Sequence, residues 1–348
     1  MAAQDVNFKD LLAAVSRGET LNVDDAATAF DIMMSGDATP SQMGAFLMAL
    51  KVRGETVEEI TGAVQAMRKR ALKLKAPEDA IDIVGTGGDM AHTYNISTAT
   101  ALVVAGTGIP VAKHGNRAAS SRSGTADALS CLGVDWEAPI ENVERSIREA
   151  HIGFLMAQRH HGAMRNVGPT RVELGVPTIF NMLGPLSNPA QVKRYLVGTY
   201  RKDSVDMMAQ SLANLGAESA WVVHGADGLD ELSSTGVSMV TEYKNGKMNH
   251  FEVAPEDAGL PRATLEDLRG GTPEENAQAI RDLLDGKPGP YRDVVLLNAA
   301  AAIIVSDKAN NLKDGVAIAA ESIDKGRARQ SLETLVAITG QKEEENDE

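Results

Sequence analysis

The chain has 348 residues, of which 43% are hydrophobic and 24% are charged, an ordinary globular composition that argues against disorder and against membrane spanning. Its 48 acidic and 34 basic residues give a net charge of −14, which disfavours broad electrostatic binding to nucleic acid. The single cysteine, Cys131, can form neither an internal disulfide nor a thiolate metal site, and its apolar neighbours favour core packing. Because the first residues also lack the regions of a signal peptide, we expect a cytoplasmic protein of about two domains.

Residues 1 to about 75 are predicted to form helices only. Thr39-Pro40-Ser41-Gln42 places a hydroxyl, a proline and an amide where a helix begins, and Thr56 with Glu59 forms a second capping box. The second helix ends on the basic run 68–70, which favours a solvated helix terminus over a ligand site.

From residue 81 the pattern changes to strands that alternate with helices. Strands are predicted at 81–84, 109–112, 153–156 and 221–223, and helices at 97–105, 124–132, 141–150, 204–215 and 293–305. This alternation predicts a largely parallel sheet covered on both faces. The glycines and prolines of 165–189 predict a segment that crosses between two lobes rather than regular structure.

Glycine-rich residues 85–89 follow the first predicted strand. Their backbone N–H groups can approach an anion closely, but the loop lacks the Lys-Ser/Thr pair of a Walker loop and the spacing of a dinucleotide fingerprint. A structural tight turn explains it equally well. The next helix begins near His92-Thr93-Tyr94-Asn95-Ile96-Ser97-Thr98, where Asn95 or Ser97 alone is explained as an N-cap. Together these hydroxyl and amide groups exceed what one cap requires and predict a second anion site.

The polar loop predicted at 113–123 contains Lys113, Arg117 and Arg122 beyond the end of a strand. In so acidic a chain this cluster favours binding of a polyanion over a solvated loop. All three loops follow strands, and ligands of open α/β sheets bind at the carboxyl ends of strands.

Further along, Asp230 and Glu231 in 227–231 are adjacent carboxylates that suit Mg²⁺, although a surface acidic turn explains them as well. The histidines have no zinc-type spacing, and the His160-His161 pair cannot act as a two-histidine ligand on a regular backbone.

Taken together, these segments resemble the anthranilate phosphoribosyltransferases. The matching segments are Gly85-Thr-Gly-Gly-Asp89, Asn95-Ile-Ser-Thr98, Lys113-His-Gly-Asn-Arg117, Ser123-Gly-Thr-Ala-Asp127, Arg171 with its neighbours, 175–189 and Asp227-Gly-Leu-Asp-Glu231. Their order and spacing extend over nearly the whole chain. Two departures are Gly162, where the family has proline, and Thr125, where serine is commoner. Neither departure removes a hydrogen-bond donor.

The resemblance implies an α/β fold with a small all-helical domain and a larger α/β domain around a central, mostly parallel sheet, of the nucleoside phosphorylase and phosphoribosyltransferase type. The helical domain spans 1–75 and is completed by a crossing segment at about 165–190. The α/β domain spans 76–164 and 191–341, and an acidic tail occupies 342–348. The resemblance also implies an active site in the cleft between the domains and a homodimer formed through the helical parts.

The resemblance implies two small-molecule substrates, phosphoribosyl pyrophosphate and anthranilate, with Mg²⁺ as cofactor. The phosphoribosyl pyrophosphate site comprises Gly85, Gly88, Asp89, Thr93, Asn95, Ile96, Ser97, Thr98, Lys113, His114, Gly115, Asn116, Arg117, Ala118, Ala119, Ser120, Ser121 and Thr125. Gly85, Asn116 and Arg171 contact anthranilate, and Ser97, Asp230 and Glu231 hold Mg²⁺. No general base is assigned firmly, since an aromatic amine can attack without prior deprotonation; His114 is the candidate.

Two other functions remain open on the sequence. A pyrimidine-nucleoside phosphorylase shares the two-domain architecture and the glycine-rich anion loops, whereas the contexts of Asn116 and Arg171 favour the transferase. A non-catalytic relative that binds nucleic acid requires a broad basic face, and the net charge argues against one.

Overall fold

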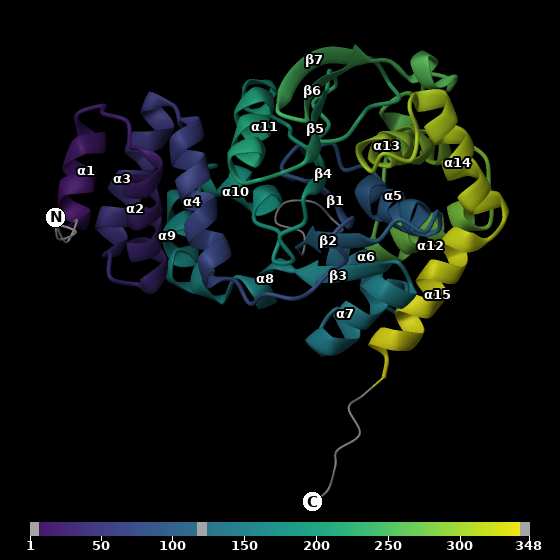
Figure 1. The fold of residues 1–348 in the computed structure, drawn as a ribbon, viewed down its shortest axis with the longest axis horizontal. Coiled ribbons are helices and arrows are strands. Elements are labelled where there is room, and N and C mark those ends of the chain that lie inside the picture. The colour runs from purple at the N-terminus through teal and green to yellow at the C-terminus, as the bar shows by residue number, and fades with distance from the viewer. Residues whose placement is uncertain (1–6, 117–123, 342–348) are drawn as a thin grey trace, which may run out of the picture.

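The computed structural model describes residues 7–116 and 124–341, and it places a helical bundle beside a seven-stranded sheet (Figure 1). The bundle contains α1 (Phe8–Ser16), α2 (Val23–Ser35), α3 (Pro40–Arg53) and α4 (Val57–Arg70). Both predicted capping boxes are present, because Thr39 pairs with Gln42 and Thr56 pairs with Glu59 in both directions. The apolar faces of these four helices form a core that includes the fully buried Phe46.

The sheet has the strand order β3-β2-β1-β4-β5-β6-β7, and the first five strands run parallel. The strands are β1 (Ile81–Gly85), β2 (Val111–Gly115), β3 (Ile152–Met156), β4 (Arg194–Gly198), β5 (Ser219–Gly225), β6 (Ser238–Lys244) and β7 (Lys247–Val253). The antiparallel β6–β7 hairpin extends one edge. The chain runs from β1 outward to β2 and β3 and then returns to β4 on the other side of β1. This reversal places a topological switch point between β1 and β4, where open α/β sheets bind ligands.

The predicted strand at 109–112 is displaced, because β2 runs from Val111 to Gly115 and contains Lys113 and His114. The expectation that these two residues lie in a polar loop is therefore wrong. Both side chains are buried, and buried polar partners from β1 and α10, described below, replace the water that a loop would offer them.

Helices cover both faces of the sheet (Figure 1). The α-helices that follow the first four are α5 (Ile96–Ala105), α6 (Thr125–Cys131), α7 (Ile140–Glu149), α8 (Ala157–His160), α9 (Gly168–Leu174), α10 (Phe180–Leu186), α11 (Val205–Asn214), α12 (Pro273–Leu284), α13 (Pro290–Val305), α14 (Leu312–Asp324) and α15 (Arg327–Thr339). Alternate strand residues divide between two cores: Ile81 and Ile83 pack with α5 and α13, whereas Val84 and Tyr195 belong to the core that continues into the helical bundle. This division follows from the two-residue repeat of a strand. Within the described residues no helix is long and apolar enough to cross a membrane.

Residues 165–189 are not irregular as predicted, since they form α9 and α10. In α9 proline and glycine mark the ends of the helix: Pro169 lies in the first turn, and Gly175, with φ of 63°, ends it. In α10, by contrast, Gly184 and Pro185 lie inside the helix. α9 packs against α3, and α10 packs against α4 and α11.

The basic end of α4 is also only partly the solvated terminus that was predicted. Arg68 donates to the Leu186 carbonyl oxygen at 2.7 Å and to the Tyr195 hydroxyl at 3.0 Å, and its side chain is partly buried. Arg68 therefore links α4 of the bundle to β4 of the sheet by a hydrogen bond.

Candidate active site

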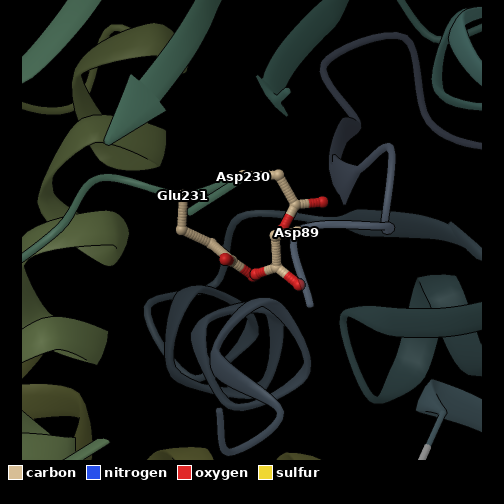
Figure 2. A group of neighbouring side chains, drawn as sticks. All are labelled: Asp89, Asp230 and Glu231. Atoms are coloured by element: carbon tan, nitrogen blue, oxygen red, sulfur yellow. The ribbon is translucent and has the colours of Figure 1, made fainter. Parts of the chain in front are cut away.

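Three carboxylates gather at the carboxyl ends of β1 and β5 (Figure 2). Asp89 follows β1, and Asp230 and Glu231 follow β5; one oxygen atom from each lies within 4.8 Å of the other two. Asp230 also accepts a hydrogen bond from the Gly87 N–H at 2.7 Å through Oδ2. The glycine-rich loop and the acidic loop, 143 residues apart in sequence, thus form one structure.

Two glycines allow this close approach. A Cβ atom on Gly85 would lie 2.1 Å from Asp230 Oδ2, and one on Gly198, at the end of β4, would lie 1.4 Å from the Asp230 carbonyl oxygen. No side chain fits at either position. Gly198 was not singled out from the sequence, because its role depends on a loop that follows another strand. Asn298 of α13 was also missed; its buried amide bonds to both the N–H and the carbonyl of Leu232, next to Glu231.

The electrostatics of the cluster disfavour three ionised carboxylates with no cation bound between them. Burial, followed by the charge of Asp230, raises the pKa of Asp89 to about 6. Burial and the charges of Asp230 and Asp89 raise the pKa of Glu231 well above its usual value. Glu231 Oε2 is buried without a hydrogen-bond partner. A hard divalent cation bound by carboxylate oxygens would compensate these charges and satisfy that oxygen, so the residues fit Mg²⁺.

Ser97 and Lys113 complete the same site. Ser97, Asp230, Glu231 and Gly198 line one small cavity together with residues of β1, β4 and β5 and Asn298. Lys113 Nζ donates to the Ile83 carbonyl at 2.7 Å and lies 3.4 Å from Ser97 Oγ. Burial lowers the pKa of Lys113 to about 8, against the opposing charges of Asp82, Glu231 and Asp230. Ser97 and the acidic loop line this cavity, and hydrogen bonds from Lys113 to Ser97 and from Gly87 to Asp230 bring β2 and the glycine-rich loop to the same site.

The segment before α5 is fixed by the C-terminal half of the chain. The Asn95 side chain does not cap α5 and instead accepts a hydrogen bond from Asn276 at 2.9 Å. Tyr291 donates to the Asn95 carbonyl at 3.2 Å and packs its ring against Tyr94, with the centroids 4.6 Å apart. Asn95 lies at the N-cap position, as predicted, but its side chain makes no capping hydrogen bond, so the first turn of α5 offers N–H groups to an anion.

The other predicted site residues lie as follows. Thr93 forms a β-bridge with Arg269, Ile96 and Thr98 are buried in α5, Gly88 lies beside the Tyr200 ring, Gly115 ends β2 next to Thr125, and Asn116 is exposed just beyond it. Residues Arg117 to Ser121 fall outside the described part of the chain. Asp227 does not join the cluster; its Oδ2 accepts hydrogen bonds from the hydroxyls of Ser233 and Thr235.

His114 has a buried ring whose Nδ1 donates to the Gly184 carbonyl of α10 at 3.1 Å. The ring also packs edge-on against His161 at 5.1 Å. Burial, and then the neighbouring histidines, lower the pKa of His114 well below its usual value. A ring with so low a pKa is a weak proton acceptor near neutral pH, which argues against His114 as a general base.

Arg171 lies on α9, which packs against α3 of the helical bundle (Figure 1). Its guanidinium carbon is 5.2 Å from the centre of the Phe180 ring, a cation–π contact. Burial lowers the pKa of Arg171, but a guanidinium stays charged at any physiological pH. It therefore offers a preset, planar pair of donors to a carboxylate.

Comparison with known proteins supports the same class. The chain matches the α/β domain of a glycosyl transferase family over residues 77–329 and the helical bundle domain of a glycosyl transferase family over residues 9–71. The fold and these matches therefore define a glycosyl transferase.

Individual relatives narrow this class. The anthranilate phosphoribosyltransferase of Parvibaculum lavamentivorans is 60% identical over 97% of this chain and 98% of its own length. The crystal structure of the Thermus thermophilus enzyme of that name has a TM-score of 0.91 at 45% identity, covering 95% of this chain and 99% of the other. The Saccharomyces cerevisiae enzyme in complex with PRPP and Mg has a TM-score of 0.87 at 29% identity, and the match covers 97% of this chain and 98% of the yeast chain. The chain belongs to the anthranilate phosphoribosyltransferase family.

Proposed function

We propose that this protein transfers the phosphoribosyl group of 5-phosphoribosyl 1-pyrophosphate to the amine of anthranilate, giving N-(5-phosphoribosyl)anthranilate and pyrophosphate, in tryptophan biosynthesis. The observation that carries the proposal is that hydrogen bonds and the carboxylate cluster bring the glycine-rich loop, the start of α5, Lys113 and the acidic loop together at one site. Yeast relatives bind PRPP with Mg, and 4-fluoroanthranilate.

The proposed site keeps the assignments that the resemblance implies. Phosphoribosyl pyrophosphate contacts residues of 85–98, 113–121 and Thr125, whereas Gly85, Asn116 and Arg171 contact anthranilate. Ser97, Asp230 and Glu231 hold Mg²⁺, and the geometry adds Asp89 to this set, since its carboxylate lies in the same cluster. A bound Mg²⁺ would neutralise negative charge that develops on the departing pyrophosphate.

The chain's own residues then have distinct tasks. The bond between C1 of the ribose and the pyrophosphate oxygen breaks while the amine nitrogen forms its bond to C1, so positive charge develops on the sugar. The Lys113 ammonium group and the N–H groups of the glycine-rich loop stabilise the leaving pyrophosphate in a site of low dielectric. Arg171 binds the carboxylate of anthranilate and thereby aims the amine at C1. The amine attacks with its own lone pair and loses its proton afterwards, which agrees with the low basicity of His114.

A homodimer formed through the helical parts belongs to this proposal. Val52 of α3 and Val172 of α9 are each 81% exposed, and Val176 just after α9 is 41% exposed. α3 and α9 pack against each other, and the exposed valines on these elements are apolar side chains that a second copy of the chain can cover. We also propose the domain division at residues 75–76, with 165–190 completing the helical domain, and a cytoplasmic location.

The test is direct. The purified protein is incubated with anthranilate, phosphoribosyl pyrophosphate and Mg²⁺, and N-(5-phosphoribosyl)anthranilate and pyrophosphate are measured by mass spectrometry and by a coupled pyrophosphate assay. A parallel reaction with thymidine and phosphate tests the phosphorylase alternative, and a gel-shift titration with single-stranded DNA tests the nucleic-acid alternative. Product in the first reaction alone supports the transferase. Nucleoside cleavage without product from anthranilate would overturn it.

A further inference from the structure

The sheet opens between β1 and β2 on the side of the proposed active site. These two strands pair only at Ile81 and Val111, near their amino ends, whereas β1 pairs with β4 and β2 pairs with β3 over five residues each. The backbone groups that face this opening are buried and require other partners.

Side chains provide those partners. Asp82 Oδ1 accepts the His114 N–H at 3.0 Å, and Asn188 donates through Nδ2 to the Ala112 carbonyl at 2.8 Å. The same amide nitrogen also donates to Asp82 Oδ2 at 2.7 Å. Together with the bond from Lys113 to Ile83 described above, these contacts replace the missing ladder between the two strands.

The contacts of residue 82 require a carboxylate, because both of its side-chain oxygens accept hydrogen bonds. Asp82 and Asn188 are both fully buried, and the two Asp82 oxygens each face a donor. The orientation of Asn188 is fixed as well, because its Oδ1 accepts the Ala190 N–H at 2.8 Å. An asparagine at position 82 would have to turn one N–H toward another N–H, which leaves a buried polar group unsatisfied.

Asp82 thereby joins three segments that the mechanism uses. It belongs to β1, which leads into the glycine-rich loop; it fixes β2, which leads to Asn116; and it bonds to Asn188, which follows α10. On the basis of the proposed function, we propose that Asp82 is a positioning residue. Paired with Asn188, it sets where Lys113 to Asn116 lie relative to Gly85 to Asp89, and so governs binding of the pyrophosphate group without touching it.

The experiment compares Asp82→Asn with Glu59→Gln. Glu59 is a matched control, because it is a fully buried carboxylate in the bundle whose oxygens accept the Leu21 and Thr56 N–H groups, each at 3.0 Å. Each replacement exchanges one buried acceptor for a donor, and Glu59→Gln also removes the charge that pairs with Arg53, so the control is expected to lose at least as much stability. KM for each substrate and kcat are measured at a temperature where circular dichroism shows each variant folded. The melting temperature of each variant is measured separately by thermal unfolding.

We expect Asp82→Asn to lower kcat/KM for phosphoribosyl pyrophosphate at least tenfold, and Glu59→Gln to leave both KM values within twofold of wild type. Calorimetric titration with inorganic pyrophosphate and Mg²⁺ gives a readout independent of turnover, and we expect at least tenfold weaker binding for Asp82→Asn only. Wild-type kinetics and pyrophosphate affinity in folded Asp82→Asn would overturn the inference. If that variant does not fold, Asn188→Ala, which removes a donor to the same carboxylate, is judged by the same two outcomes. A wild-type protein that binds pyrophosphate but forms no product would instead refute the proposed function.

Discussion

Gly198→Ala tests whether the close approach of β4 to the acidic loop positions the cluster. The added Cβ would lie 1.4 Å from the Asp230 carbonyl oxygen, whereas real Cβ contacts are almost never shorter than 3.0 Å. The blocking atoms are backbone atoms of Asp230, so Asp230 must move by about 1.6 Å, and overpacking of this kind typically costs about 1–3 kcal/mol.

This displacement has a defined consequence for activity. It breaks the 2.7 Å bond from Gly87 to Asp230 and moves Asp230 and Glu231 away from Asp89. Because a misplacement of about 1 Å can cost roughly 100-fold in rate, we expect kcat to fall by about two orders of magnitude and half-saturation to require at least tenfold more Mg²⁺. The melting temperature should fall by only several degrees, as expected for about 1–3 kcal/mol.

The assay is product formation as a function of Mg²⁺ concentration, with thermal unfolding measured in the same buffer. Gly236→Ala is the control, because a Cβ at that position meets nothing within 4 Å and the glycine has no positive φ. We expect that control to match wild type. A Gly198→Ala protein with wild-type Mg²⁺ dependence would refute the role given to the close approach of β4.

Four further predictions follow from the same contacts. Arg171→Ala should raise KM for anthranilate by about 10- to 100-fold, the value of a charged hydrogen bond, and an unchanged KM in a folded variant would remove Arg171 from the site. Asp230→Asn combined with Glu231→Gln should abolish activity at limiting Mg²⁺ while stabilising the metal-free protein, as urea unfolding in a chelator can show; full activity would contradict the metal assignment. Val172→Glu should convert a dimer to monomers in light scattering, and an unchanged mass would place the interface elsewhere. Burial raises the pKa of Asp82 to about 7, so the folded state binds this proton more tightly than the unfolded chain; wild-type stability should therefore decline from about pH 4 to pH 7. Asp82→Asn should lack that part of the decline in urea titrations, and an identical decline in both proteins would contradict the assignment.

Features that depend on neighbouring residues could be predicted from the sequence. The capping boxes at Thr39 and Thr56 were both predicted, because a cap joins residues three positions apart. The β6–β7 hairpin was missed although a local signal exists. Asn245 and Gly246 join the strands with φ of 52° and 78°, and this residue pair between alternating strands is typical of a tight hairpin.

Features that depend on distant residues could not be predicted in the same way. The local sequence predicts a loop position for Lys113, because the carbonyl that accepts its hydrogen bond belongs to Ile83, thirty residues earlier. Gly198 has no local feature that distinguishes it from any other glycine; only the Asp230 loop, which follows the next strand, makes it necessary. The family resemblance identified the segments of the site, but their depth of burial follows from how the sheet opens and which loops cross its edge.

The direction of the pKa shifts distinguishes the buried carboxyls of the site from carboxyls in surface ion pairs. Surface carboxyls such as Asp31 and Glu218 have a lowered pKa, because each accepts a hydrogen bond from a cation in a partly or fully solvated ion pair. At the opened edge of the sheet the shifts are reversed: burial raises the pKa of Asp82 and Asp89 and lowers that of Lys113. Each reversed shift means that the folded state holds a charge at a cost in stability. A fold with two large apolar cores tolerates that cost, and a Mg²⁺-bound diphosphate offers charges of both signs that would offset it.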